Sequence, residues 1–234
     1  MRRYVEDVAI LRAVWSFGCL TRRQIAGLAG FTEQTAQSRV HPLWVAGALR
    51  RDRPRYHGPY LYRIGPAVDT IAAELGHGWH PRPGQIQHTM LTADLVVALL
   101  RRCSVPVTGW AGEAELRTMA TAGEPRPDAA LTWRFGEASG RWLLEADRGT
   151  ENHQIWRRKL YGYRGLRPDE VVLVGAPNRH RAGRIAAAAN QANVALLAAV
   201  SADLLAGGDP IVYDARVHRR RPLTEASTGI VAKV

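Results

Sequence analysis

One segment near the middle of this 234-residue chain constrains its fold most strongly, because it joins two extended apolar runs through one tight turn. The runs cover residues 126–135 and 141–148, and glycines bound the turn at 136–140. Two such runs at this spacing predict a β-hairpin. Directly opposed residues of a hairpin lie about 5 Å apart. We therefore expect Asp128 of the first strand to lie beside Glu145 of the second.

Helix and strand patterns continue on both sides of this hairpin. Apolar residues at helical spacing predict a helix over 86–102. Further extended runs predict strands at 107–117, 170–176 and 194–200, with helices between the later strands. This order predicts the α/β class, with a mixed β-sheet and helices on its faces.

The N-terminal part of the chain carries the pattern of three helices and a basic hairpin. An apolar face at helical spacing runs from Val5 to Trp15. A second helix begins at Thr21, and Gln24 three residues later completes a capping-box pattern. A third helix begins at Thr32, and residues 50–64 then form a strand, an arginine-rich loop and a returning strand (the wing). This order is typical of a winged helix-turn-helix, whose recognition helix enters the major groove of DNA.

Short polar side chains and arginines on the third helix and the wing are residue types that bind base edges and phosphates. We expect the DNA contacts to come from these two elements. The expected contact residues are Gln34, Thr35, Gln37, Ser38, Arg39, Arg51, Arg53 and Arg55. In the alternative interpretation, the winged helix binds protein or dimerises, and both a homodimer and a monomer are compatible with the sequence.

The formal net charge of +11 favours a polyanionic partner, and DNA is the leading one. An arginine-rich proteome encoded by a GC-rich genome is the alternative explanation of this charge. No phosphate-binding glycine loop occurs, so nucleotide hydrolysis and dinucleotide binding have no support in the sequence. No apolar run reaches 18 residues, and Glu6 and Asp7 precede any apolar segment. We therefore expect a cytoplasmic protein with no membrane partner.

Composition indicates where the domains divide. Residues 76–85 are rich in Gly, Pro and His and lack periodicity, which is typical of a linker. We expect a winged helix-turn-helix domain at 1–75 and an α/β domain at 86–215. The basic residues that follow predict a tail at 216–234, which either contacts the DNA backbone or is disordered.

Three carboxylates and one lysine cluster in and after the hairpin. Asp147 follows Glu145 by two residues and so faces the same side of the strand. Hard cations such as Mg²⁺ or Mn²⁺ take oxygen ligands and keep several waters, so Asp128 and Glu145 could hold one together with a substrate phosphate. Lys159, in the next helical run, is the candidate to neutralise charge on that phosphate.

A structural interpretation stays open for each of these side chains. Asp128 follows a proline and can cap a turn. Glu145 and Asp147 can pair with nearby arginines. Lys159 can be a solvated lysine beside basic neighbours.

The order of these elements resembles the core of the PD-(D/E)XK nucleases. The residues that carry this resemblance are Pro127, Asp128, Glu145, Ala146, Asp147 and Lys159. In that superfamily a further acid often precedes the hairpin, and here Glu113 or Glu115 holds that place. The resemblance implies catalytic roles for these acids and Lys159 in phosphodiester hydrolysis with Mg²⁺ or Mn²⁺. One departure stands against it, because Asp147 occupies the position where the nuclease pattern has lysine.

Residues 5–200 resemble the replication-relaxation family of plasmid and mobile-element proteins from actinobacteria and their relatives. The winged-helix pattern, the segments 144–151 and 171–176, and the pair Lys159 and Tyr163 carry this second resemblance. It implies a DNA-binding protein that acts in replication or mobilisation as a metal-dependent endonuclease or nickase, with replication or mobilisation proteins as partners. The alternative is a non-catalytic DNA-binding regulator or adaptor with a degenerate nuclease fold and no metal.

Overall fold

The computed structural model describes residues 2–53, 58–68, 80–120 and 125–231. The chain divides into two compact units, one of Met1–Val97 with Gly112–Met119 and one of Ala98–Ala111 with Ala120–Val234. Within the described residues, one sheet has three strands and another has seven. Residues 76–79 of the predicted linker lie outside the described residues, and the predicted domain limits stay a prediction.

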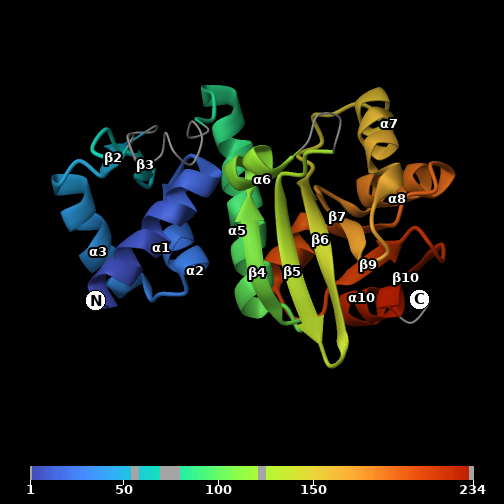
Figure 1. Ribbon diagram of the computed structural model, residues 1–234. Helices are drawn as coiled ribbons and strands as arrows, with labels where there is room; N and C mark the ends of the chain where they lie inside the picture. The colour runs from blue at the N-terminus through green and yellow to red at the C-terminus, as the bar shows by residue number, and fades with distance from the viewer. Residues whose placement is uncertain (1, 54–57, 69–79, 121–124, 232–234) are drawn as a thin grey trace. The chain divides into compact units, whose positions relative to one another are not determined.

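The first unit consists mainly of helices with a small antiparallel sheet (Figure 1). Its elements are α1 (Arg2–Phe17), β1 (Leu20–Thr21), α2 (Arg22–Ala29), α3 (Glu33–Val45), β2 (Leu49–Asp52), β3 (Leu61–Ile64), a 3₁₀ turn (Pro83–Gln85), the first part of α5 (Ile86–Arg102) and α6 (Glu113–Met119). The strand order is β1-β3-β2, with β3 antiparallel to both neighbours. Three helices followed by two antiparallel strands match the predicted order of elements, and their assignment as a winged helix-turn-helix stays a prediction.

Side-chain caps determine where the helices of this unit begin. The Thr21 hydroxyl accepts a hydrogen bond from the Gln24 N–H, and the Gln24 side chain accepts one from the Thr21 N–H at 3.0 Å. This confirms the predicted capping box of α2. Gly30 ends α2 in the left-handed conformation, with φ of 77°, and Thr32 caps α3. The core is formed by buried side chains of the first three helices, among them Ile10, Val14, Phe17, Ile25, Ala36 and Val40.

The second unit contains the seven-stranded mixed sheet, with strand order β10-β9-β8-β7-β6-β5-β4. Its elements are β4 (Val107–Gly112, whose last residue belongs to the first unit), β5 (Ala129–Phe135), β6 (Ala138–Ala146), α7 (His153–Gly162), a 3₁₀ turn (Tyr163–Gly165), β7 (Glu170–Ala176), α8 (Arg179–Gln191), β8 (Leu196–Val200), α9 (Ser201–Ala206), β9 (Ile211–Asp214), β10 (Arg219–Pro222) and α10 (Leu223–Val231). The antiparallel β5–β6 pair is the predicted hairpin, and β6, β7 and β8 run parallel. The predicted α/β class with a mixed sheet and flanking helices is confirmed.

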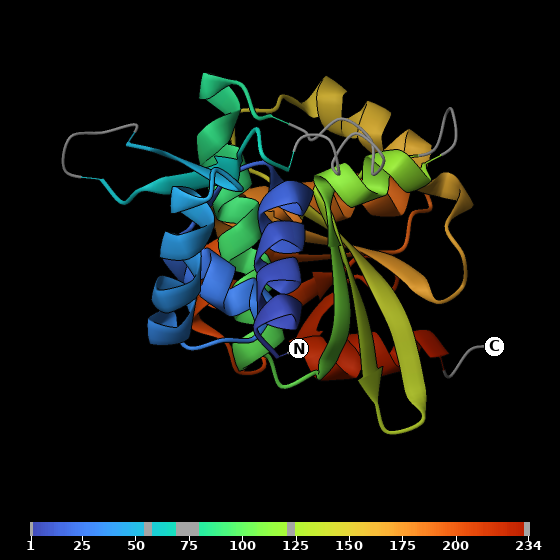
Figure 2. The same ribbon diagram turned by 60° about the vertical axis from the view of Figure 1, so that its left-hand side comes forward.

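The central strands explain the stability of this sheet. Strands β7 and β8 are apolar along almost their whole length and are buried, as is typical of parallel strands covered on both faces. Trp133 and Trp142 are fully buried on β5 and β6, with ring centroids 6.0 Å apart. Figures 1 and 2 show α7 at the end of this sheet opposite the β5–β6 turn. Residues at the start of β5 and at the end of β6 therefore lie at the same end of the sheet as α7.

The strand predicted over 107–117 is only half right. Strand β4 ends at Gly112, and Glu113 and Glu115 lie on α6. Acidic side chains stabilise the first turn of a helix through its dipole, which explains why these residues are helical.

The basic tail predicted from residue 216 is also corrected, because the described residues to 231 form β10 and α10. Arg216 and Arg221 both donate hydrogen bonds to Asp214 on β9, whose side chain is fully buried. Burial alone raises the pKa of Asp214, but the bonds and charges of the two arginines outweigh it, and the pKa lies below its ordinary value. These arginines neutralise a buried acid in the fold.

No helix in the described ranges combines the length and the apolar character that a bilayer crossing requires.

Gly140 of β6 offers a test of the packing under the hairpin. A Cβ at this position would lie 2.7 Å from the ring of Trp133 and 2.8 Å from the carbonyl oxygen of Asp169. We expect Gly140→Ala to lower the free energy of unfolding by about 1–3 kcal/mol in urea denaturation, because a buried ring and backbone would have to move. Gly165→Ala is the control, since no described heavy atom lies within 4 Å of its added Cβ. Equal losses in the two variants would contradict the packing explanation.

Candidate active site

Glu145 lies one residue before the end of β6 and is 2% exposed. The strand register pairs Ala129 with Leu144, so Asp128, one residue before β5, comes next to Glu145 as the hairpin predicted. Asp128 Oδ2 accepts a hydrogen bond from the Ala146 N–H at 2.8 Å. Two carboxylates are therefore held against the same stretch of backbone.

Two side chains from α7 and the turn after it close over Glu145. Lys159 Nζ donates to Oε2 at 2.8 Å, and the Tyr163 hydroxyl donates to Oε1 at 2.6 Å. Residues four apart share one face of a helix, so a single turn presents both donors. Lys159 faces the acids, which is one of the two interpretations that the sequence left open. Tyr163 was not predicted as a site residue, although its spacing from Lys159 was the signal that could have found it.

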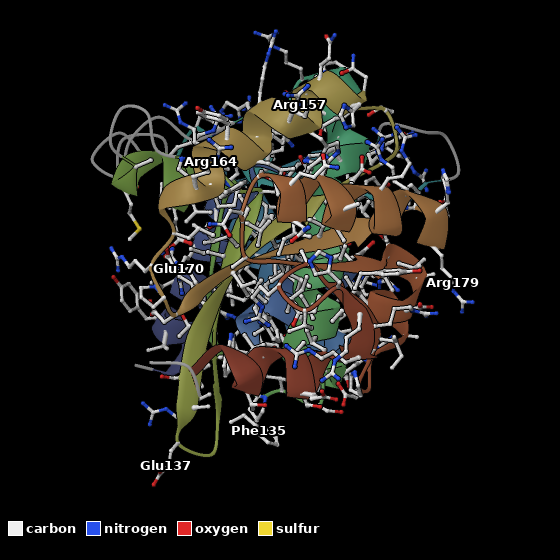
Figure 3. All side chains as sticks on the ribbon, turned by 90° about the vertical axis from the view of Figure 1, so that its right-hand side faces the viewer. Phe135, Glu137, Arg157, Arg164, Glu170 and Arg179 are labelled. Atoms are coloured by element: carbon white, nitrogen blue, oxygen red, sulfur yellow. The ribbon has the colours of Figure 1, made fainter. Side chains whose placement is uncertain are left out.

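Local sequence fixes where α7 begins. The Asn152 side chain caps the helix by accepting a hydrogen bond from the Ile155 N–H at 3.0 Å. Trp156 and Leu160 are buried and anchor the inner face of the helix. Lys159 lies beside these anchors on the same helix. Figure 3 shows this helix, marked by Arg157, at the opposite end of the unit from Glu137 in the β5–β6 turn.

The electrostatics of this cluster are dominated by burial. Burial raises the pKa of Glu145, and the neighbouring charge of Asp128 raises it further. Lys159 and Tyr163 lower it in part, and the result is a pKa of about 7. Burial lowers the pKa of Lys159, but Glu145 and Glu151 outweigh this and hold it above its ordinary value. Burial and the Glu145 charge raise the pKa of Tyr163. The pKa of Glu145 therefore lies near neutral pH.

Asp147, predicted as catalytic, is bound to α8. Its side chain is fully buried, with Oδ2 accepting a hydrogen bond from Arg181 Nε at 2.6 Å and Oδ1 accepting one from the Gly149 N–H at 2.9 Å. Asn178 caps α8 through the Arg181 N–H and so orients this arginine. The position where the nuclease pattern has lysine thus holds an acid paired with arginine.

Glu151 was not predicted as a site residue. It contacts both Lys159, the partner of Glu145, and Arg181, the partner of Asp147. Its Oε1 lies 2.9 Å from Lys159 Nζ, and its carbonyl oxygen accepts a hydrogen bond from Arg181 Nη2 at 2.5 Å. The loop between β6 and α7 therefore ties both helices to the acids at the end of the strand.

Glu113 and Glu115, the further acids implied by the nuclease resemblance, belong to the first unit. Glu113 accepts a hydrogen bond from Arg117 Nε at 3.1 Å. Glu115 accepts hydrogen bonds from Arg12 at 2.9 Å and from Ser16 at 2.6 Å. Their role toward Asp128 and Glu145 stays a prediction.

On α3, the predicted DNA-contact residues fall into two groups. Gln34, Gln37 and Ser38 are exposed. Thr35 is half-buried and bonds to the capping Thr32, while the Arg39 guanidinium binds Asp7 of α1 and is only 16% exposed. The structure therefore directs Arg39 toward α1.

On the wing, Arg51 and Arg53 are exposed, and Arg55 lies outside the described residues. Their contact with DNA stays a prediction.

The donor set at Asp128 and Glu145 fits a small hard cation with a largely aqueous shell. Within the described ranges, no group of three or more His, Cys, Asp or Glu side chains is placed to hold a metal ion. Two carboxylates are nevertheless sufficient when waters and a substrate phosphate supply the remaining oxygens of Mg²⁺. Both oxygens of Glu145 already accept internal hydrogen bonds, so a metal would share this carboxylate with Lys159 and Tyr163.

Comparisons with known proteins identify one family. The family described as Replication-relaxation matches residues 11–172. Among solved structures, restriction endonuclease FokI is similar at 11% identity over 86% of this chain and 43% of that chain, with a TM-score of 0.34. FokI bound to DNA is similar at 10% identity over the same shares, with a TM-score of 0.33. The chain spans less than half the length of these structures, and no curated protein matches its sequence.

The raised pKa of Glu145 predicts how Glu145→Gln changes stability with pH. Because the folded-state pKa of about 7 lies above the ordinary 4.5, the stability contributed by this group is complete below about pH 4.5 and is lost as pH rises through about 7. Glutamine does not titrate. The melting temperature of the variant minus that of the wild type should therefore increase between these two pH values in thermal unfolding.

Glu151→Gln is the matched control, since it removes the other carboxylate that pairs with Lys159. The side chain of Glu151 is 28% exposed. A melting-temperature difference for Glu145→Gln that stays flat or falls with pH would contradict the assignment.

Proposed function

The chain belongs to the replication-relaxation family, and on that premise we propose that it binds DNA through its winged-helix unit and hydrolyses a phosphodiester bond at Asp128 and Glu145. Membership of this family connects the protein with DNA replication. In this proposal the protein acts as an endonuclease or nickase in the replication or mobilisation of a plasmid or mobile element. The observation that carries the proposal is the ion pair of Lys159 with buried Glu145, beside Asp128.

Asp128 and Glu145 are the side chains that would hold Mg²⁺ or Mn²⁺. When bound, the metal supplies a water of lowered pKa and polarises a phosphoryl oxygen. The protein's own contribution is positional and electrostatic. Tyr163 keeps its proton and fixes the orientation of Glu145 through Oε1.

Lys159 supplies the positive charge that the nuclease pattern places two residues after the glutamate. It reaches Glu145 from α7 and keeps its proton, because its pKa is raised. A lysine ammonium within hydrogen-bond reach of a phosphate stabilises the charge that develops there during hydrolysis. Asp147 has a different task in this proposal, since its pairing with Arg181 anchors α8 to the end of β6.

One observation favours a second function, that of a non-catalytic DNA-binding regulator or adaptor. Both oxygens of Glu145 and both oxygens of Asp147 accept hydrogen bonds from within the chain. Buried charges that are paired and hydrogen-bonded in this way can serve the fold alone. In this alternative the second unit supports a homodimer or a protein partner and requires no metal.

Cleavage of DNA distinguishes the two functions. Supercoiled plasmid and single-stranded DNA are incubated with the purified protein and Mg²⁺ or Mn²⁺, and nicked and linear products are measured. We expect Asp128→Asn, Glu145→Gln and Lys159→Met each to lower the cleavage rate by about 100-fold or more. The first two variants lose a carboxylate that would hold the metal, and the third loses the positive charge that would act on the phosphate. DNA binding, measured separately, should remain.

Glu170→Gln is the matched control, because Glu170 is a carboxylate of the same sheet that pairs with Arg141 outside this site. Its cleavage rate should equal that of the wild type. A wild-type protein that binds DNA and cleaves none would favour the adaptor. Cleavage that persists in all three site variants would exclude the proposed site.

A further inference from the structure

We propose that a hollow between α3 and the wing holds a phosphate group of the DNA backbone, with Arg51 as its ligand and with Trp44 and Tyr60 as the residues that position Arg51. This inference rests on the proposed DNA binding of the first unit and identifies the place and the chemistry of one contact. It assigns a binding role to side chains of α3, of β2 and of the residue before β3.

Aromatic rings hold the Arg51 guanidinium in place. Its central carbon lies 3.8 Å from the ring centroid of Trp44 and 4.4 Å from that of Tyr60. Both distances are well inside the range of a cation–π contact, about 6 Å. Trp44 belongs to α3 and Tyr60 to the wing, so one arginine is stacked against two separate elements. Less freedom is then lost when this arginine binds a ligand than when an unrestrained side chain does so.

The ring contacts leave the edge of the guanidinium as its binding surface. All five N–H donors of arginine lie in the plane of the group and point outward from its edge. Two parallel donors at such an edge match two oxygens of a phosphate. Arg53 also lies against Tyr60, with its guanidinium carbon 4.9 Å from the ring centroid.

The lining of the hollow selects an anion. Its volume is about 210 Å³, and Arg22 and Arg51 line it together with Gln37, His41 and aromatic rings. Among the lining residues that the structure describes, none is a carboxylate. Within the described part of the chain, neither Arg22 nor Arg51 forms an ion pair with an acid. Two cations without an acidic counterpart therefore border one small space.

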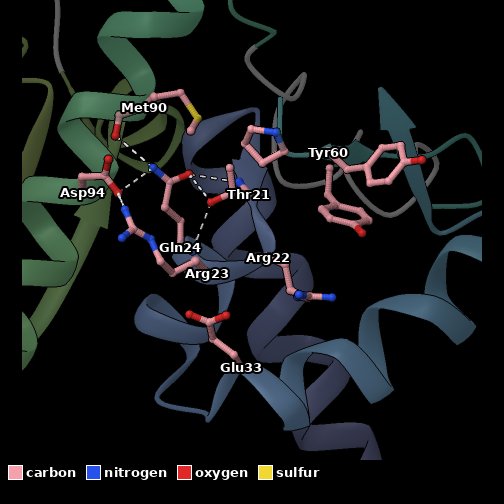
Figure 4. A pocket seen from close by; sticks show the side chains of 10 residues that line it. Thr21, Arg22, Arg23, Gln24, Glu33, Tyr60, Met90 and Asp94 are labelled. Atoms are coloured by element: carbon pink, nitrogen blue, oxygen red, sulfur yellow. Dashed lines mark hydrogen bonds and ion pairs between the residues drawn. The ribbon is translucent and has the colours of Figure 1, made fainter. Parts of the chain in front are cut away.

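A larger hollow beside it has a different character. It measures about 410 Å³ at the start of α2, and its lining includes the acids Glu33 and Asp94. Asp94 lies 3.2 Å from Arg23 and accepts a hydrogen bond from Gln24 at 3.0 Å, as the dashed lines in Figure 4 show. Figure 4 also shows Arg22 pointing away from this network. Arg22 lines both hollows, but acids lie only in the described lining of the larger one, so the smaller one is the anion site.

A phosphate fits this arrangement better than a base edge. A guanine edge requires one bidentate arginine, whereas two cations that border one hollow match the negative charge of a phosphodiester. Phosphate contacts fix the register of a DNA-binding unit, and base contacts read the sequence. Bound here, a phosphate would hold α3 so that its exposed residues Gln34 and Ser38 face the bases.

The test measures the affinity of the full chain for fluorescently labelled duplexes of two unrelated sequences, by anisotropy in EDTA over a series of salt concentrations. We expect Arg51→Ala to weaken binding about tenfold on both duplexes, because a charge-assisted bond to phosphate is lost. The slope of log affinity against log salt should also fall in magnitude by about 1. Arg50→Ala is the matched control, since Arg50 precedes Arg51 on β2 and points to the other face of the strand. Its affinity and salt slope should stay near those of the wild type.

Variants of Tyr60 test the positioning role. Tyr60→Phe keeps the ring and should bind as the wild type does. Tyr60→Leu keeps the Arg51 charge but removes one ring, so it should weaken binding several-fold while the salt slope is retained.

Three results would overturn the proposal: equal losses in Arg50→Ala and Arg51→Ala, a loss in Arg51→Ala on one duplex alone, or wild-type binding by Tyr60→Leu. In each of these the wild type still binds DNA and the proposed function stands. A wild type that binds neither duplex would overturn the DNA binding itself.

Discussion

The burial of Glu145 at the end of β6 is the constraint on which the rest of the second unit depends. A carboxylate withdrawn from water costs several kcal/mol unless donors surround it, and this one also lies beside a second acid, Asp128. Lys159 and Tyr163 offset both effects in part, and they can do so only if α7, capped by Asn152, lies across the end of the strand. The position of α7 and the position of the acid therefore determine each other.

Sequence patterns were sufficient where local periodicity decides the structure. The hairpin followed from two extended runs and a glycine turn, and the α2 cap followed from the Thr21 and Gln24 spacing. They were insufficient where a long side chain chooses among distant partners. Arg39 occupies a helix position that suits DNA, yet Asp7 of α1 lies within its reach. No spacing in the sequence brings these two residues together.

The arginines that make the chain basic fall into two classes: some pair with acids inside the fold, and others lie at the surface. Arg39, Arg181 and Arg221 pair with acids and are mostly buried, so they contribute to the fold and little to any external field. Arg51 lies against aromatic rings instead. Net charge alone could not separate these two classes, because the distinction depends on which acids fold next to which arginines.

Glu151 serves two helices with different parts of the same residue. Its carboxylate binds Lys159 of α7, and its backbone carbonyl binds Arg181 of α8. The second bond does not depend on the identity of the side chain, whereas the first requires an acid. A change of amino acid at this one position would therefore leave the anchoring of α8 in place and alter only the charge that Lys159 experiences. The electrostatic environment of Lys159 can thus change in evolution while the contact between the loop and α8 is kept.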